Sequence, residues 1–240
     1  HVGGNPLVNA SGDTASPDNP VVTIFNYSNR NFQTNTDGTA KAELPSGASR
    51  LVANKQTGTL FGEAYSPHSK KLFTSAFLKR HSGLGSLGSG GIYMIEPSGT
   101  FPNTTVTPLL NLDSLGIETN SPDTANELHV KTNDERGLPW GYLEPNNDAS
   151  AFAQVGRVSL GDLDLADNGR YLFVTNLYKK SVVKIDLQDA KNPQIPSAAQ
   201  VQEFTLTPPN CVNGEFRPFA LKYYRDELYI GSVCDATTSN

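Results

Sequence analysis

The most constraining feature of this chain is a pattern that occurs three times: an apolar strand, a polar turn and a second apolar strand. The copies begin at Leu60, Leu160 and Phe216 and read LFGEAYSPHSKKLFTSAFL, LGDLDLADNGRYLFVTNLY and FRPFALKYYRDELYIGSVC. β-branched and aromatic residues on both sides of a turn that contains Pro, Asn or Asp are typical of a β-hairpin. The repeat therefore predicts an all-β chain built from similar units.

Two of the copies are followed by two further candidate strands. These are Ile92–Glu96 and Thr105–Leu112 after the first copy, and Ser181–Leu187 and Ala199–Thr205 after the second. A four-stranded sheet cannot bury both faces until neighbouring sheets stack on it, and such sheets repeated around an axis are the blades of a β-propeller. We therefore expect a β-propeller of four-stranded antiparallel blades, because a sandwich would not repeat whole sheets.

The strands that can be counted do not complete a ring. Residues 1–20 form a polar lead-in, residues 21–240 form the partial propeller from a first strand at Val21–Tyr27, and the third copy holds only two strands. An open ring exposes sheet faces and a strand edge, which soluble proteins avoid. We expect the missing strands to come from the same chain or from another chain.

Composition agrees with this fold class and excludes two kinds of partner. The 21 Gly and 16 Pro among 240 residues supply turns, while 9 Tyr and 11 Phe supply an aromatic core. A formal net charge of -5 argues against a nucleic-acid partner. The sequence also lacks an apolar run of the roughly 18 residues that a membrane-spanning helix needs, so we expect no membrane insertion.

A long polar segment, residues 113–154, interrupts the repeat. It is rich in Pro and Asn, contains Trp140, the only Trp, and is much longer than an ordinary connection. Long insertions between blades lie on one face of a propeller and often carry binding residues. We therefore expect Trp140 to contribute to a ligand site.

Three segments of the chain resemble a known family. They read SAFLKRHSGLGSLGSGGIYMIE, VSLGDLDLADNGRYLFVTNLYKKSVVKIDL and NCVNGEFRPFALKYYRDELYIGSVC. These segments resemble the propeller region of bacterial SdrD B-like domain-containing secreted and surface proteins. The order of the three segments and the sequence of the FLKRHSGLG loop carry the resemblance. The resemblance covers about Leu60 to Cys234 and departs from the family mainly at 113–154. It implies further blades, an extracellular or cell-surface location and a multi-domain protein, but no reaction.

Asp162 and Asp164 alternate along one predicted strand, so both point to one side of it. Because the first strand of a blade lines the central channel, the two carboxylates are candidates for a calcium site or an acid–base pair. A third interpretation is that one of them caps a turn or accepts backbone N–H groups between blades. Glu63 and Arg217 take the matching places in the other copies. They are candidates for ligand binding, or they could form with Asp162 a ring of charges that neutralise one another.

Lys79, Arg80 and His81 precede a Gly-rich loop. A phosphate-binding P-loop requires Gly-x4-Gly-Lys-[Ser/Thr] between a strand and a helix, and here the basic residues come before the glycines. We therefore exclude that mechanism. Two interpretations remain, an exposed contact to an anion or a glycan and a solvated, tightly turned loop.

Cys211 and Cys234 flank the third hairpin. Antiparallel pairing brings the two ends of a hairpin together, so a disulfide is geometrically reasonable, and an oxidising location would preserve it. The alternative is two buried thiols.

No pattern typical of a catalytic site occurs. The four His lie far apart without the spacing of zinc ligands, and no GxSxG elbow is present. We expect an extracellular, non-enzymatic propeller module of a larger bacterial protein, used for adhesion, assembly or binding of a glycan or surface protein. The alternatives are a hydrolase or lyase with carboxylates at the propeller channel, and a structural component of a surface layer or filament.

Overall fold

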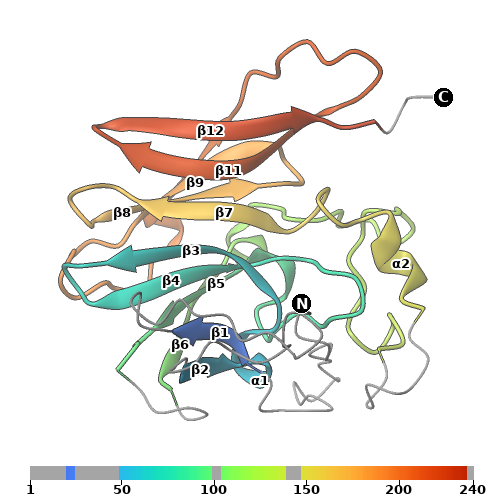
Figure 1. Ribbon diagram of the computed structural model, residues 1–240. Helices are drawn as coiled ribbons and strands as arrows, with labels where there is room; N and C mark the ends of the chain where they lie inside the picture. The colour runs from blue at the N-terminus through green and yellow to red at the C-terminus, as the bar shows by residue number, and fades with distance from the viewer. Residues whose placement is uncertain (1–19, 25–48, 99–103, 139–146, 237–240) are drawn as a thin grey trace, which may run out of the picture.

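The computed structural model describes residues 20–24, 49–98, 104–138 and 147–236 (Figure 1). In these ranges the protein is all-β, with four antiparallel sheets and a few short helical turns. The strands are β1 (Pro20–Ile24), β2 (Ser49–Ala53), β3 (Leu60–Ser66), β4 (Lys71–Ala76), β5 (Gly91–Ile95), β6 (Val106–Asn111), β7 (Leu160–Leu165), β8 (Tyr171–Asn176), β9 (Ser181–Asp186), β10 (Val201–Thr205), β11 (Phe216–Tyr224) and β12 (Glu227–Cys234). The helical turns are α1 (Asn54–Thr57), α2 (Ala149–Phe152), η1 (Gly88–Gly90), η2 (Asp113–Leu115) and η3 (Ala198–Gln200).

The strands expected from the repeat are confirmed as β3 to β12, with ends that differ by no more than about two residues. The predicted first strand begins as β1, and its part beyond Ile24 lies outside the described residues. Strand β2 was missed because its sequence, SRLVA, combines a short apolar run with a polar start. Its Leu51 and Val52 are buried, so packing on the neighbouring sheet stabilises a strand that local propensity predicts poorly.

Each four-stranded sheet is a meander in chain order, β3-β4-β5-β6 and β7-β8-β9-β10, whereas β1-β2 and β11-β12 are two-stranded. The turn between β11 and β12 consists of Arg225 and Asp226, both with positive φ (51° and 62°). Two central residues of positive φ are typical of a type I′ turn, whose twist matches that of the strands it joins.

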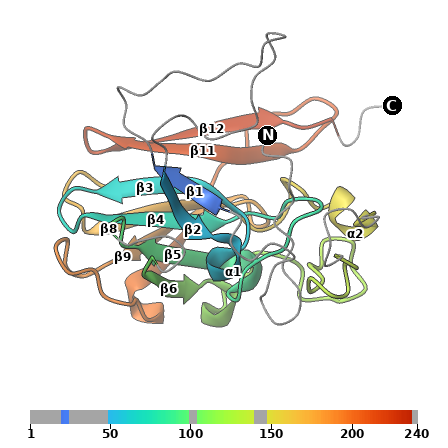
Figure 2. The same ribbon diagram turned by 60° about the horizontal axis from the view of Figure 1, so that its bottom comes forward.

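The sheets stack face to face in chain order (Figures 1 and 2). The largest core lies between the two four-stranded sheets, where Phe73 and Ile92 of one sheet meet Leu163 and Leu172 of the other. A smaller core joins the β1–β2 sheet to the opposite face of the first four-stranded sheet, and includes Ile95. Burial of these apolar faces is what holds the stack together, at about 25 cal/mol per Å² of apolar surface removed from water.

Strands β3, β7 and β11, the first strands of the last three sheets, lie side by side with β7 in the middle (Figure 1). We call them the inner strands. All three have an irregular register at the same place, between Leu60 and Glu63, between Leu160 and Leu163, and between Pro218 and Ala220. This shared irregularity shows that the repeat extends to details of backbone geometry that the residue pattern does not reveal.

A hydroxyl group of one sheet bonds to the inner strand of the next sheet at two equivalent places. Ser75 Oγ on β4 donates to Gly161 O on β7 at 2.7 Å, and Thr175 Oγ1 on β8 donates to Phe219 O on β11 at 3.2 Å. The inner strands approach closely here, since a Cβ on Gly62 would lie only 2.6 Å from Leu163 N. Glycine is therefore required for steric reasons at Gly62.

The all-β prediction is confirmed, and the described residues do not show a closed ring of blades. None of the described helices has the length and hydropathy needed to cross a membrane.

Candidate functional site

The loops that lie next to the first residues of the inner strands are all on one side of the molecule. Helix α2 and the loops drawn in green and yellow-green lie beside the first residues of β3 and β7 (Figure 1). The Gly-rich loop and the described part of the 113–154 insertion both belong to this side. We call it the loop face.

A buried ion pair anchors the insertion to the loop that follows β4. Arg136 donates from Nε to Asp148 Oδ1 at 3.1 Å and from Nη2 to Asp148 Oδ2 at 2.7 Å, and both side chains are fully buried. Arg136 Nη2 also donates to Lys79 O at 2.9 Å, and His81 N donates to Asp148 Oδ2 at 2.6 Å. A buried pair with this many contacts fixes the position of the insertion.

The loop face contains a hollow of about 690 Å³, which we call the loop pocket. Its walls are residues 84–89 of the Gly-rich loop, Asn111 at the end of β6, Asp113 at the start of η2, and parts of the insertion, namely Gly116, Glu118 and residues 120–122 and 129–133. This volume lies in the range of small-molecule binding sites. Described residues of the insertion thus line part of a cavity of this size, and the expectation that the insertion binds a ligand stays a prediction.

Hydrogen bonds between side chains and backbone fix the walls of the loop pocket. Asp113 accepts from Thr119 N and Thr119 Oγ1, both at 2.7 Å, and Ser89 Oγ lies 2.9 Å from Thr119 Oγ1. Across the pocket, Leu84 N donates to Asn133 Oδ1 at 3.0 Å and Asn133 Nδ2 donates to Leu84 O at 2.9 Å. The two walls are thus preorganised around the cavity.

Several lining groups keep hydrogen-bonding capacity for a ligand. His129 Nδ1 lies 2.8 Å from Ser121 O, and since a carbonyl oxygen only accepts, Nδ1 carries the hydrogen and Nε2 is left as an acceptor in the neutral ring. Glu118 uses Oε2 to accept from Lys179 Nζ at 3.1 Å on the surface, and Lys131 is exposed. The pocket therefore offers acceptors and donors together, which suits a ligand with several hydroxyl groups.

The basic residues predicted from sequence hold the loops rather than line the loop pocket. Arg80 Nη2 donates to Asn147 O at 2.7 Å, and its guanidinium lies 5.3 Å from the centroid of the Phe152 ring. Lys79 and His81 contribute the backbone contacts to the buried ion pair described above. Trp140 lies outside the described residues.

Asp162 and Asp164 reach from β7 to the backbone of β11. Asp162 Oδ2 accepts from Leu221 N at 3.1 Å, and Asp164 Oδ2 accepts from Tyr223 N at 2.8 Å and lies 2.8 Å from Lys222 Nζ. The structure thus shows the third interpretation above, carboxylates that accept backbone N–H groups of the next sheet.

This arrangement does not favour a calcium ion at Asp162 and Asp164. The Oδ1 atoms of both residues also accept backbone N–H groups, from Leu163 at 3.0 Å and from Leu165 at 2.9 Å. Calcium requires six to eight oxygen ligands that are not already engaged. Within the described ranges no three His, Cys, Asp or Glu side chains are grouped as a metal site.

Glu63 does not take the place of Asp162 in the repeat, so that expectation is wrong. Glu63 pairs with Thr74 and Leu163 pairs with Val174, which aligns Glu63 with Leu163 because both strands carry the same irregular register. Counting from Leu60 and Leu160, where the two copies begin, gives the same alignment, so the match of Glu63 to Asp162 followed the shared carboxylate and not the position. Glu63 reaches solvent, but the protein atoms around it displace water and raise the pKa of its carboxyl group.

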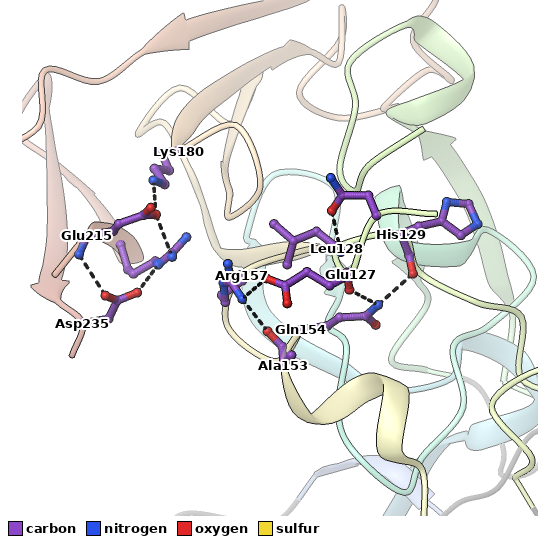
Figure 3. Close-up of polar contacts among 11 residues, drawn as sticks. Glu127, Leu128, His129, Ala153, Gln154, Arg157, Lys180, Glu215 and Asp235 are labelled. Carbon is purple, nitrogen blue, oxygen red and sulfur yellow. Dashed lines mark hydrogen bonds and ion pairs between the residues drawn. The ribbon is translucent and has the colours of Figure 1, made fainter. Parts of the chain in front are cut away.

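Arg217 belongs to a local ion-pair group and not to a ring with Glu63 and Asp162. Its Nε donates to Asp235 Oδ2 at 2.6 Å and its Nη2 donates to Glu215 Oε2 at 2.8 Å. Lys180 Nζ lies 2.6 Å from Glu215 Oε2, and Figure 3 shows Lys180, Glu215 and Asp235 gathered in this group. The hydrogen bond from Lys180 is the main reason why the pKa of Glu215 is lowered.

The predicted disulfide is confirmed. Cys211 and Cys234 are bonded, with their Cα atoms 5.5 Å apart. The bond ties the segment that leads into β11 to the end of β12, so it stabilises the β11–β12 hairpin by restricting the unfolded chain.

Sequence reasoning missed Asp113 and His129, which line the loop pocket, and the Arg136–Asp148 pair, which holds the insertion in place. They come from a segment without strand or helix periodicity, so no spacing rule relates them. The one usable signal was the length and polarity of the insertion itself.

Comparison with known proteins finds similarity to colossins of Dictyostelium discoideum. Colossin-B is 28% identical over 79% of this chain, Colossin-C is 26% identical over 93% and Colossin-D is 24% identical over 90%. The chain spans 4% of the length of Colossin-B and 22% of the lengths of Colossin-C and Colossin-D. No family model and no solved structure matches the chain.

These relatives are eukaryotic, so the resemblance to bacterial SdrD B-like proteins and the expected bacterial source are wrong. Short strands with polar turns occur in many unrelated repeat proteins. The matched segments therefore reflected the fold class better than the source of the chain.

Proposed function

We propose that this chain is part of a β-propeller that serves as a non-enzymatic binding module. The propeller is supported by the stacking of sheets in chain order and by the inner strands that lie side by side. The irregular register at one place in all three inner strands supports it further. A sandwich of two sheets would not produce these three features together.

The β12 strand suggests how the partial ring is extended. In the two four-stranded sheets a third strand, β5 or β9, pairs with the second strand, and in the described residues no strand takes this place beside β12. From Leu228 to Cys234 the strand carries no charge and no Pro, the devices that normally prevent pairing at an edge. We expect a further strand, from the same or another chain, to pair with it.

The ligand that suits the loop pocket best is a glycan. The single observation that carries this assignment is a pocket of about 690 Å³ with fixed walls and both acceptors and donors on its surface. Hydroxyl groups both donate and accept, so a sugar matches such a lining. The alternative of a hydrolase or lyase has less support, since Asp162 and Asp164 already accept N–H groups of β11.

We place the module outside the cell, at the cell surface or in a secreted protein. The Cys211–Cys234 disulfide supports this location, because such bonds persist in oxidising compartments. Adhesion or assembly of a surface layer would follow from glycan binding combined with pairing at β12.

A glycan array tests the proposed function. Ser86 is exposed and lines the loop pocket, so Ser86→Trp should occlude the cavity and abolish binding of the glycans that the unmodified chain retains. Ser98, which is exposed on the turn after β5 and away from the pocket, provides the control Ser98→Trp, which should bind as the unmodified chain does. Absence of any bound glycan, or equal binding by Ser86→Trp, would contradict the proposal.

A further inference from the structure

A second hollow on the loop face, of about 420 Å³, lies between α2 and the beginning of the β11–β12 sheet. We call it the arginine hollow. It shares no residue with the loop pocket. Its lining includes two guanidinium groups and several apolar side chains, and three of the latter are well exposed: Phe152 (73%), Val155 (39%) and Val233 (61%). Apolar side chains that stay exposed around a cavity mark a candidate interaction site.

Three arginines of the described residues bind carboxylates in a similar way. Arg136 and Arg170 each use Nε and Nη2 to bind both oxygens of one aspartate, at distances between 2.7 and 3.1 Å. Arg217, which lines the arginine hollow, uses the same two atoms for Asp235 and Glu215. This edge of the guanidinium is the one that matches the geometry of a carboxylate.

Arg157, the other arginine of the hollow, is different. Its Nη1 donates to Glu127 Oε1 at 2.9 Å and to Ala153 O at 3.1 Å (Figure 3). Its Nε is buried without a hydrogen-bond partner, and its described contacts use Nη1 alone. Glu127 is 64% exposed, so this ion pair holds the guanidinium weakly.

We propose that the arginine hollow binds a small ligand that carries a carboxylate next to an aromatic or branched apolar group. The carboxylate takes Nε and Nη2 of Arg157 after a small rotation of the guanidinium and displaces Glu127. The apolar group lies against Phe152 and Phe219. A volume of about 420 Å³ suits a ligand of the size of one aromatic amino acid.

The charges around the hollow favour an anion at Arg157 over one at Arg217. Two carboxylates, Asp235 and Glu215, already neutralise Arg217. Arg80, above the ring of Phe152, adds a positive charge beside the apolar wall. The proposed ligand class therefore follows from two features, the guanidinium of Arg157, whose Nε has no hydrogen-bond partner, and the apolar surface next to it.

Calorimetric titration of the 240-residue chain with N-acetylphenylalanine tests the proposal, with N-acetylphenylalaninamide as the neutral control. Replacing a charge-assisted hydrogen bond by a neutral one should weaken binding about tenfold, so the acid should bind about ten times more tightly than the amide. Arg157→Gln should remove this preference. Glu127→Gln should strengthen acid binding several-fold, because the competing carboxylate is gone.

Two controls keep the result interpretable. Arg170→Gln removes an arginine whose Nε and Nη2 are already paired with Asp186, and should leave acid binding unchanged. Thermal unfolding of Arg157→Gln should match that of the unmodified chain, and Arg157→Lys, which keeps the charge but not the planar edge, should lose part of the affinity. Equal binding of acid and amide, unaltered binding by Arg157→Gln, or no heat of binding for the acid would overturn the proposal. None of these outcomes depends on glycan binding at the loop pocket.

Discussion

The contact between β3 and β7 and the contact between β7 and β11 join equivalent strands in two different ways. On β3 the residues that face the next sheet are Gly62 and Ala64, and the absence of long side chains lets the backbones approach closely. On β7 the equivalent residues are Asp162 and Asp164, and their carboxylates bridge to backbone N–H groups of β11. The same fold unit can thus be stacked by close packing or by side chains that act as acceptors.

The largest expected effect comes from filling the close contact. Gly62→Val places a branched side chain where even a Cβ would lie 2.6 Å from Leu163 N, so it should lower the free energy of unfolding by about 3 kcal/mol or more. Urea unfolding followed by circular dichroism measures the change. Ala220, exposed at the equivalent place on β11, gives the matched control, since Ala220→Val should change stability little. If both variants lost a similar free energy of unfolding, the close approach of β3 and β7 would not be the reason why position 62 requires glycine.

The second effect concerns the carboxylate contact. Asp162→Ala leaves the N–H groups of Leu221 and Leu163 without acceptors, and should cost about 2 kcal/mol of unfolding free energy. Asp162→Asn keeps one acceptor oxygen and should cost clearly less. Amide hydrogen exchange should show faster exchange at Leu221 in the alanine variant, while exchange within β3 to β6 stays unchanged. Uniformly faster exchange throughout the chain would contradict a local role in stacking β11.

A smaller loss of stability is expected from removing the hydroxyl–carbonyl hydrogen bond that the two sheet contacts have in common. Ser75→Ala and Thr175→Ser test the hydroxyl groups that bond to Gly161 O and Phe219 O. Ser75→Ala removes a hydrogen bond from a buried carbonyl and should cost about 1 kcal/mol, whereas Thr175→Ser keeps the hydroxyl and should lose less. Thermal unfolding of both variants and of Thr175→Val separates the hydroxyl from the methyl group. If Thr175→Val costs no more than Thr175→Ser, the hydrogen bond to β11 does not stabilise the stack.

The smallest effect is the pH dependence contributed by Glu63, which takes on β3 the place of Leu163 on β7. Its pKa is raised above the ordinary value of 4.5 by desolvation, so the folded state holds the proton more tightly than the unfolded state does. This contribution to stability is fully present below pH 4.5 and is lost as the pH rises through the raised pKa. Glu63→Gln should remove the loss, and Glu215, whose pKa is lowered, should give the opposite pH dependence. An NMR titration in which Glu63 has an ordinary pKa would contradict this assignment.

Much of the fold could be predicted from the sequence because it depends on local patterns. Apolar strands such as those ending at Ser66 and Leu165, with the polar turns that follow them, are typical of β-hairpins, and Cys211 and Cys234 flank such a hairpin. The register could not be predicted, because one extra residue in an inner strand reverses the faces that follow it. Glu63, by contrast, was aligned with Asp162 because both carry a carboxylate, although its position three residues after the start of its copy matches Leu163, as it does in the structure.

The candidate sites were less predictable than the strands. The insertion could be recognised by its length, but His81, which donates to Asp148, and Ser89, which donates to Asp113, lie in a separate loop and are brought to the insertion only by the folded backbone. Arg157 could not be recognised from the sequence, because the feature that sets it apart is a buried Nε without a hydrogen-bond partner, which only the folded structure shows. Long-range contacts of this kind follow no sequence periodicity.

The carboxylate contact from β7 has a consequence for how such proteins can diversify. Asp162 and Asp164 bind main-chain N–H groups of Leu221 and Tyr223, groups that almost any residue would provide. A hairpin with quite different side chains could pack on β7 in the same position, provided that it has no proline where Leu221 and Tyr223 now stand. Two aspartates on one strand would then allow neighbouring units to be exchanged or to drift in sequence while the spacing of the array is preserved.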